Sequence, residues 1–133
     1  MRKSSPILNL IVLIAILAVA ACSDNTLAPF QPEISNVVDT FQLQATGVTN
    51  RTATLNYNWS NTGTLASVNH STTTTAGSAR VVIRDGAGTL VYNEILVPSL
   101  NEPTLVGVAG TWTVQLVLDG YSGTLNFRVQ KTT

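Results

Sequence analysis

From Asp39 to the C-terminus, apolar and polar residues alternate along most of the chain. The clearest segment is 53–59, in which Ala, Leu, Tyr and Trp are separated by Thr and Asn. A period of two predicts β-strands with one face on a core and the other in solvent. The same pattern marks residues 41–45, 79–84, 112–118 and 125–129, with a further strand expected at 90–97 and a more polar edge strand at 66–73.

Short clusters of Gly, Asn, Asp and Pro separate these segments, and the apolar spacing typical of helices is absent. Such residues occur where a chain reverses direction. The clusters occupy residues 47–50, 61–63, 85–88, 98–103 and 119–123. We therefore predict that residues 39–133 form an all-β domain, an antiparallel immunoglobulin-like β-sandwich of about seven strands.

The last two strands resemble a known arrangement. Gly110–Val114 followed by Ser122–Val129 is similar to the final hairpin of bacterial immunoglobulin-like and prepeptidase C-terminal-type accessory domains, where Gly-x-Trp/Tyr-x-Val precedes the last strand. The resemblance implies a β-sandwich and no particular activity. A single Cys means that the paired cysteines of antibody domains are absent, which leaves the topology open.

Residues 1–21 have the layout of a secretory signal peptide. Arg2 and Lys3 give a positive start, residues 10–21 form an unbroken run of twelve apolar residues, and this run ends in small side chains. A membrane-spanning helix needs about 20 apolar residues, so a permanent anchor helix is the weaker interpretation. An ordinary secreted protein is the alternative to the lipidated form considered next.

The segment Val19-Ala20-Ala21-Cys22 resembles the lipobox of bacterial lipoproteins. The resemblance implies that signal peptidase II recognises Val19, Ala20 and Ala21, that Cys22 carries a diacylglycerol on its sulfur, and that the mature chain begins there. Two or three acyl chains hold a protein at a bilayer, because each buried methylene contributes about 0.8 kcal/mol. Residues 22–38 would be the lipidated Cys and the tether, which is either a linker or a loosely attached first strand. The expected location is the bacterial cell envelope, with the outer membrane favoured because Ser23 follows the Cys.

Composition narrows the possible partners. The whole chain has seven basic and seven acidic residues, and loss of Arg2 and Lys3 with the signal peptide leaves a net charge of −2. No basic surplus remains to hold a phosphate backbone, so no nucleic-acid partner is expected. One Cys and one His exclude a disulfide framework, Cys-based zinc sites and multi-histidine metal centres. We expect no metal and no cofactor.

Few residues are suited to catalysis. His70 is the only imidazole, and Ser71 beside it would point to the opposite face of a strand, so we expect a solvated or edge-strand histidine. Nothing in the spacing places Glu94 and Glu102 in one cleft, as a pair of acidic catalysts requires. The segment 120–123 reads Gly-Tyr-Ser-Gly and is interpreted as a hairpin turn, not as a nucleophile elbow. We expect no enzyme activity.

Aromatic residues offer the best chance of a ligand site, because exposed rings on a β-sandwich can stack on sugars. Trp59 and Trp112 are in phase with aliphatic neighbours, which predicts that they belong to the core. Tyr92 and Tyr121 are better candidates for exposed, ligand-binding rings, Tyr121 because it lies in a predicted turn.

Three hypotheses follow for function. The leading one is a non-enzymatic, membrane-anchored envelope lipoprotein whose sandwich binds another protein or takes part in envelope assembly, with sheet edges as docking surfaces. The second is a glycan-binding lipoprotein that uses exposed aromatic rings, Tyr121 first. The third is a small hydrolase that uses His70.

Overall fold

The computed structural model describes residues 30–133, and this part of the chain contains strands and no helix. It therefore includes no helix long and apolar enough to cross a bilayer. Seven strands follow one another along the described residues. They are β1 (Glu33–Val37), β2 (Thr40–Asn61), β3 (Ala66–His70), β4 (Thr73–Arg84), β5 (Leu90–Ile95), β6 (Leu100–Pro103) and β7 (Gly110–Lys131).

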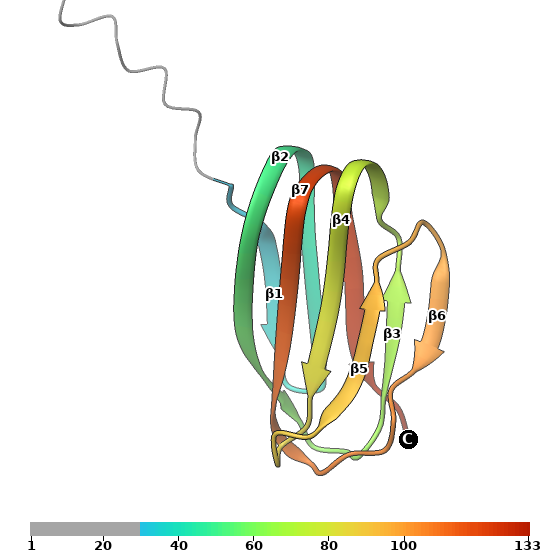
Figure 1. Ribbon diagram of the computed structural model, residues 1–133. Helices are drawn as coiled ribbons and strands as arrows, with labels where there is room; N and C mark the ends of the chain where they lie inside the picture. Colours follow the sequence, from blue (N-terminus) through green and yellow to red (C-terminus); the bar gives the residue numbers. More distant parts are fainter. Residues whose placement is uncertain (1–29) are drawn as a thin grey trace, which may run out of the picture.

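All the strand pairs are antiparallel, and they join the seven strands into one sheet that is not closed into a barrel. This confirms the predicted all-β sandwich of about seven strands. Five strands follow the order β1-β2-β7-β3-β6, while β4 pairs with β7 and β5 pairs with β4. The sheet is folded over on itself, because β2, β7 and β4 arch together at one end of the domain, which we call the arched end (Figure 1).

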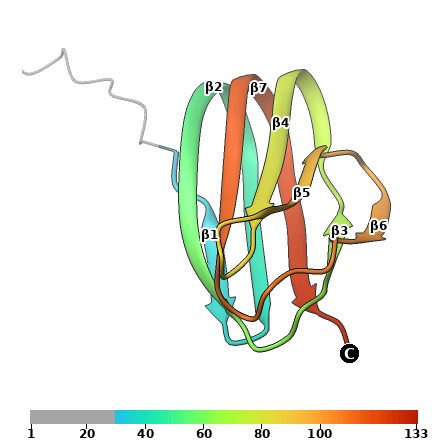
Figure 2. The same ribbon diagram turned by 60° about the horizontal axis from the view of Figure 1, so that its bottom comes forward.

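The arch divides the sheet into two layers. The first layer holds β1, β3, β6, the start of β2 and the end of β7, which pair through residues 40–45 and 125–130. The second layer holds β4, β5, the end of β2 and the start of β7, which pair through residues 53–61 and 110–118. Figure 2 shows the two layers facing each other from a second direction.

The arches replace hairpins that the sequence predicted. Gly47–Asn50 and the Gly-Tyr-Ser-Gly segment at 120–123 were expected to be turns between strands, and this interpretation is wrong. Both segments are bends within continuous strands, and β2 still pairs with β7 across them, with shifts in register around Val48 and Arg51. Positive φ angles at Gly47, Asn50, Gly120 and Gly123 provide the curvature.

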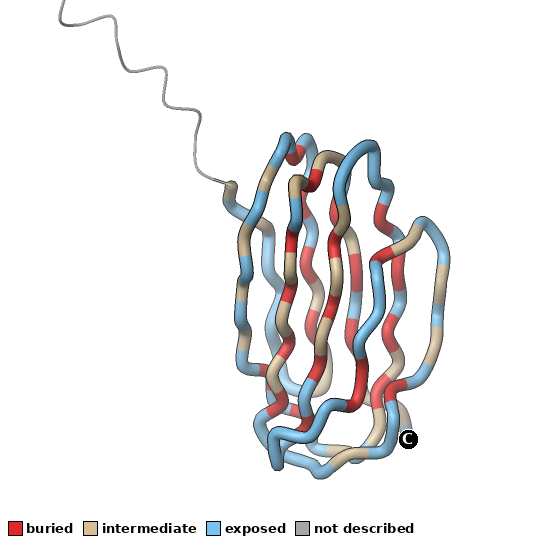
Figure 3. The backbone as a smooth tube through the Cα atoms, viewed as in Figure 1, coloured by how far each residue is buried: buried red, intermediate tan, exposed pale blue. Residues whose placement is uncertain are grey.

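The core lies between the layers, where most inward positions of the long strands are buried and alternate with more exposed ones (Figure 3). Trp59 and Trp112 are both buried there, as their phase predicted. They lie directly opposite each other on β2 and β7.

Two boundaries differ from the sequence prediction. The predicted tether, residues 22–38, includes β1, which pairs with β2 from Glu33 onward. The predicted edge strand at 66–73 is not at an edge, because β3 pairs with β7 on one side and with β6 on the other. β6 was expected to be part of a loop, and two prolines, Pro98 before the strand and Pro103 at its end, account for that interpretation.

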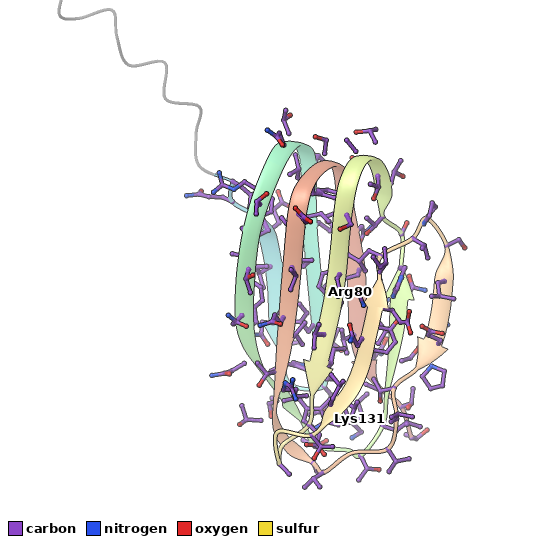
Figure 4. The ribbon with its side chains drawn as sticks, in the orientation of Figure 1. Arg80 and Lys131 are labelled. Carbon is purple, nitrogen blue, oxygen red and sulfur yellow. The ribbon has the colours of Figure 1, made fainter. Side chains whose placement is uncertain are left out.

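The end of the domain opposite the arch is fastened by Asp39, which has a positive φ of 66° in the turn between β1 and β2. Its carboxylate accepts hydrogen bonds from the Thr62 amide and hydroxyl and lies 3.3 Å from the Lys131 ammonium (Figure 4). One side chain thus joins the first turn to the ends of β2 and β7.

Candidate functional site

The predicted lipidation site, Cys22, and the recognition residues Val19, Ala20 and Ala21 lie outside the described residues. The same holds for the rest of the signal peptide and for the start of the tether. Lipid anchoring therefore stays a prediction.

Phe30 is where the described chain joins the domain, and it does so at the arched end. Its ring packs partly against the core, and the Arg51 guanidinium carbon lies 5.8 Å from the ring centroid. A groove of about 660 Å³ runs here between Phe30, the bend of β2 and residues 124–126 of β7. This position matters because any anchor at Cys22 would approach the domain from the arched end.

Tyr121 is fully buried, so the expectation of an exposed ring is wrong. The bend of β7 carries its side chain into the interior between the layers, and its hydroxyl donates a hydrogen bond of 3.2 Å to the Thr73 carbonyl. The turn-like sequence around it marks a bend at the junction of two layers, where a ring fills space.

Tyr92 is also buried, with 6% of its surface exposed, so this expectation is wrong as well. Its hydroxyl lies 2.7 Å from His70 Nε2 and donates a 2.8 Å hydrogen bond to Glu102 Oε1. On the other side of the imidazole, the Val97 amide donates to His70 Nδ1 at 3.4 Å. These contacts form a hydrogen-bonded chain, which we call the His70 chain, across β3, β5 and β6.

The charge states in the His70 chain follow from burial. Burial lowers the pKa of His70, against the opposing effect of the Glu102 and Glu94 charges. Burial also raises the pKa of Tyr92 far above its ordinary value, helped by its hydrogen bond to Glu102 and by both carboxylates. A neutral imidazole with its proton on Nε2 satisfies every contact, because Nδ1 then accepts from Val97 and Nε2 donates to Tyr92.

The expectation of a solvated His70 is wrong, since the side chain is 2% exposed. Ser71 is exposed and so lies on the other face, as predicted from strand geometry. Both ring nitrogens of His70 are engaged with Tyr92 and Val97. The side-chain hydroxyl that contacts the imidazole within the described residues is that of Tyr92, whose pKa is raised.

Glu94 and Glu102 do lie in one cleft, although their spacing in the sequence gave no sign of it. They line a cavity of about 350 Å³ between β5 and β6, with Leu90 and Leu105 at its rim. Sequence spacing could not show this, because β5 belongs to the second layer and β6 to the first, and only the fold brings the two strands together. The nearby Arg80 lies on β4 (Figure 4) and donates instead to the Asn93 side chain at 2.7 Å.

The two most exposed large apolar side chains of the described chain, Leu105 and Val106, lie in residues 104–109, which we call the apolar loop. Leu105, Val106 and Val108 are 69%, 75% and 54% exposed. The loop lies at the end of the domain remote from the arch (Figure 1). Three neighbouring aliphatic side chains in solvent are unusual in a loop and mark a surface that another molecule can cover.

The backbone of the apolar loop faces inward and is held at several points. Asp85 Oδ2 accepts a 2.8 Å hydrogen bond from the Val108 amide, and the Gly107 amide donates to the Thr64 carbonyl at 2.7 Å. The Leu105 amide donates to Val91 on β5 at 2.9 Å. The backbone of the loop is thus held by hydrogen bonds to the rest of the domain, while its aliphatic side chains are presented to solvent.

Two more exposed apolar residues lie at this end, Val37 at the end of β1 and Val38 in the turn that follows, both more than half exposed. The tryptophans link them to the loop. Trp59 Nε1 donates to the Val37 carbonyl, and Trp112 Nε1 donates to the Val108 carbonyl. The rigid indole pair therefore fixes the positions of both apolar segments.

Among residues 30–133, no group of three or more His, Cys, Asp or Glu side chains is arranged to hold a metal ion. Comparison with models of known protein families and with curated proteins finds no match to this chain. Its function is therefore inferred from geometry and chemistry.

Proposed function

We propose that this protein is a lipid-anchored component of the bacterial cell envelope that binds another envelope protein through the apolar loop. The observation that carries the proposal is the exposure of Leu105, Val106 and Val108 on a backbone held by hydrogen bonds to neighbouring segments. Binding residues are commonly found on loops that a rigid scaffold positions. Preorganisation favours binding, since little conformational entropy is lost when a partner covers the loop.

The arrangement of the two ends supports this role. Phe30 joins the domain at the arched end, so a lipid on Cys22 would place that end nearest the bilayer. The first part of β7, from Gly110 to Leu118, spans the second layer and measures about 27 Å. The apolar loop would then be held away from the membrane, where a second protein can reach it.

The neighbouring cleft narrows the chemistry of the partner. Glu94 and Glu102 line the cavity that Leu105 borders, and the residues that line it include no Lys or Arg. A partner with aliphatic side chains flanked by a basic residue complements this surface. The glycan and hydrolase hypotheses lose their support, because Tyr92, Tyr121 and His70 are buried.

A photo-crosslinking amino acid placed at position 106 of the full-length chain tests the proposal in intact cells. We expect covalent capture of one envelope protein, identified by mass spectrometry, and no such capture from position 49, which is exposed at the arched end. The double change Leu105→Asp and Val108→Asp should abolish capture. Equal labelling from positions 49 and 106 would contradict a docking role for the loop.

Lipid anchoring is tested separately by metabolic labelling with a radioactive fatty acid. We expect label on the wild-type protein and none on Cys22→Ala, together with release of that variant from the membrane fraction. If Cys22→Ala keeps both label and membrane location, the anchor is elsewhere.

A further inference from the structure

The second layer has one long free edge, formed by residues 53–61 of β2, which we call the β2 edge. This segment pairs with β7 on one side and with no other strand of the described chain. In both views it forms an outer margin of the domain (Figures 1 and 2). A free edge presents unpaired backbone groups and can accept a strand from another chain.

The other three edges carry features that discourage such pairing. β6 has four residues and ends in Pro103, β5 carries the exposed Glu94, and β1 has five residues and begins with the exposed Glu33. Short length, charge and proline are the usual protection of sheet edges. The β2 edge has nine residues with no charge, no proline and an unbroken register from Ala53 to Asn61.

Hydrogen bonds show which backbone groups face outward. The Asn58 carbonyl accepts from the Asn36 side chain, and the Ser60 carbonyl accepts from the Asp39 amide. In an antiparallel strand, backbone groups alternate between the two neighbours, so the even-numbered residues point away from β7. The carbonyls of Asn58 and Ser60 are therefore already bonded. The outward backbone groups of Thr54 and Asn56 have no partner in the described chain and face solvent.

The inward side chains along the same stretch are incompletely covered. Leu55 and Tyr57 face the core but are only half-buried, whereas their partners on β7, Leu116 and Val114, are fully buried. The side of the sandwich beside the β2 edge is therefore open. A strand added there would cover Leu55 and Tyr57 as well as the free backbone.

We propose that the β2 edges of two copies of this protein pair antiparallel about a twofold axis at Thr54. This register places Thr54 opposite its own counterpart and Ala53 opposite the second copy's Leu55. A register centred on Asn56 would oppose Thr54 to Asn58, whose carbonyl is already bonded to Asn36. The pairing does not depend on any partner at the apolar loop.

A second copy suits this edge because the edge complements itself. Residues 53–61 carry no charge, and in this register Arg51 of each copy faces an uncharged tyrosine, so self-pairing opposes no two like charges. A twofold axis makes each outward-facing residue meet another outward-facing residue, which a symmetric dimer interface requires. Arg51, whose buried Nε has no hydrogen-bond partner in the described chain, comes opposite the second copy's Tyr57.

A crosslinking experiment on the full-length chain in its native membrane tests the contact. Thr54→Cys should give a product of twice the chain mass with a short bismaleimide. Thr124→Cys is the matched control, since this threonine is also exposed and lies where β7 passes from its bend into the first layer, and the wild-type chain controls for Cys22. A Thr54→Cys yield no greater than that of the Thr124→Cys control would overturn the proposal. A product with a protein of another mass in place of the dimer would overturn it too.

A pair of variants with opposite charges at position 54 distinguishes loss of the contact from misfolding. Thr54→Lys and Thr54→Glu each place like charges on the axis, and we expect each to lower the dimeric fraction at least tenfold in sedimentation or two-tag copurification. Coexpression of the two differently tagged variants should restore a mixed dimer, because Lys then faces Glu. A wild-type protein that sediments as a monomer, or failure of the mixed pair to associate, would refute pairing at this edge.

Discussion

The indole rings of Trp59 and Trp112 meet edge to face, with centroids 5.8 Å apart and planes at 85°. They form a cross-strand pair of β2 and β7, and each N–H is bonded to the carbonyl of an exposed apolar segment. Edge-to-face pairs contribute about 0.5–1.5 kcal/mol beyond the area that they bury. The pair therefore connects the stability of the core to the geometry of the surface proposed for binding.

Replacing Trp112 by Ala should lower the free energy of unfolding by about 3–5 kcal/mol, because the side chain is fully buried and leaves a large cavity. The measurement is urea denaturation of residues 23–133. Thr113→Ala is the matched control, since this neighbour faces away from the core, and it should change stability by no more than about 0.5 kcal/mol. Similar midpoints for the two variants would show that the pair is not central to the core.

Gly77 allows β4 to approach the backbone of β7 closely at the arched end. Its φ is 67°, and a Cβ there would collide with the carbonyls of Asp119 and Gly120. Gly88 also has a positive φ, of 82°, but a Cβ there meets no atom within 4 Å. Gly88→Ala should therefore cost only the roughly 1–2 kcal/mol of a left-handed residue.

Gly77→Ala should cost clearly more, because β4 and β7 must also separate. Thermal unfolding of both variants measures the difference. Equal losses would mean that β4 can arch over β7 without this close approach.

Much of the fold could be predicted from local pattern. Alternation over 53–59 and 112–118 reflects one face on the core, and the phase of Trp59 and Trp112 followed from it. The arches could not be predicted in the same way. Gly and Asn permit both a tight hairpin and a gentle bend, and only the partner strand, here the other long strand, decides between them.

The candidate site was harder to predict, for a related reason. Tyr121 lies where the alternation is interrupted by the bend, so its phase gave no indication of burial. His70 is hydrogen-bonded to Tyr92, and Tyr92 to Glu102, and these residues lie on strands distant from β3 in the sequence. The apolar loop was not predicted because Leu and Val are also the residue types of the core. Their exposure depends on how Asp85 positions the loop backbone, which the sequence does not show.

His70 should make stability depend on pH. Burial lowers its pKa in the folded state, so the unfolded chain binds the proton more readily. The free energy of unfolding is therefore unaffected by this group above the ordinary histidine pKa of about 6.5. It decreases as the pH falls from there toward the lower pKa that His70 has in the folded state. Urea midpoints between pH 8 and pH 5 should decrease for the wild type.

His70→Gln should remove this part of the pH dependence. Because His70 is the only histidine, NMR titration of one imidazole resonance gives its pKa directly. An imidazole that titrates at or above 6.5 would contradict the neutral His70 chain.

Asp85 should control the apolar loop without belonging to its exposed surface. Burial raises the pKa of its carboxyl, but hydrogen bonds from the backbone amides of Thr89, Val108 and Ala87 outweigh burial and leave the pKa below 3.8. The Asp85 carboxylate therefore stabilises the folded state at pH values above the ordinary aspartate pKa. This contribution is lost as the pH falls through the lower pKa that the group has in the folded state. Asp85→Asn should weaken the bond to the Val108 amide, since an amide nitrogen cannot accept it.

The measurement is hydrogen exchange of the loop amides, which should become faster in Asp85→Asn while exchange in β2 and β7 stays slow. Asp119→Asn is the matched control, because this exposed carboxylate lies at the arched end. The same Asp85→Asn change should reduce photo-crosslinking from position 106, although Leu105, Val106 and Val108 are untouched. Unchanged exchange together with undiminished crosslinking would show that the loop keeps its shape without the Asp85 carboxylate, and the apolar surface would then depend on the Trp112 bond to Val108.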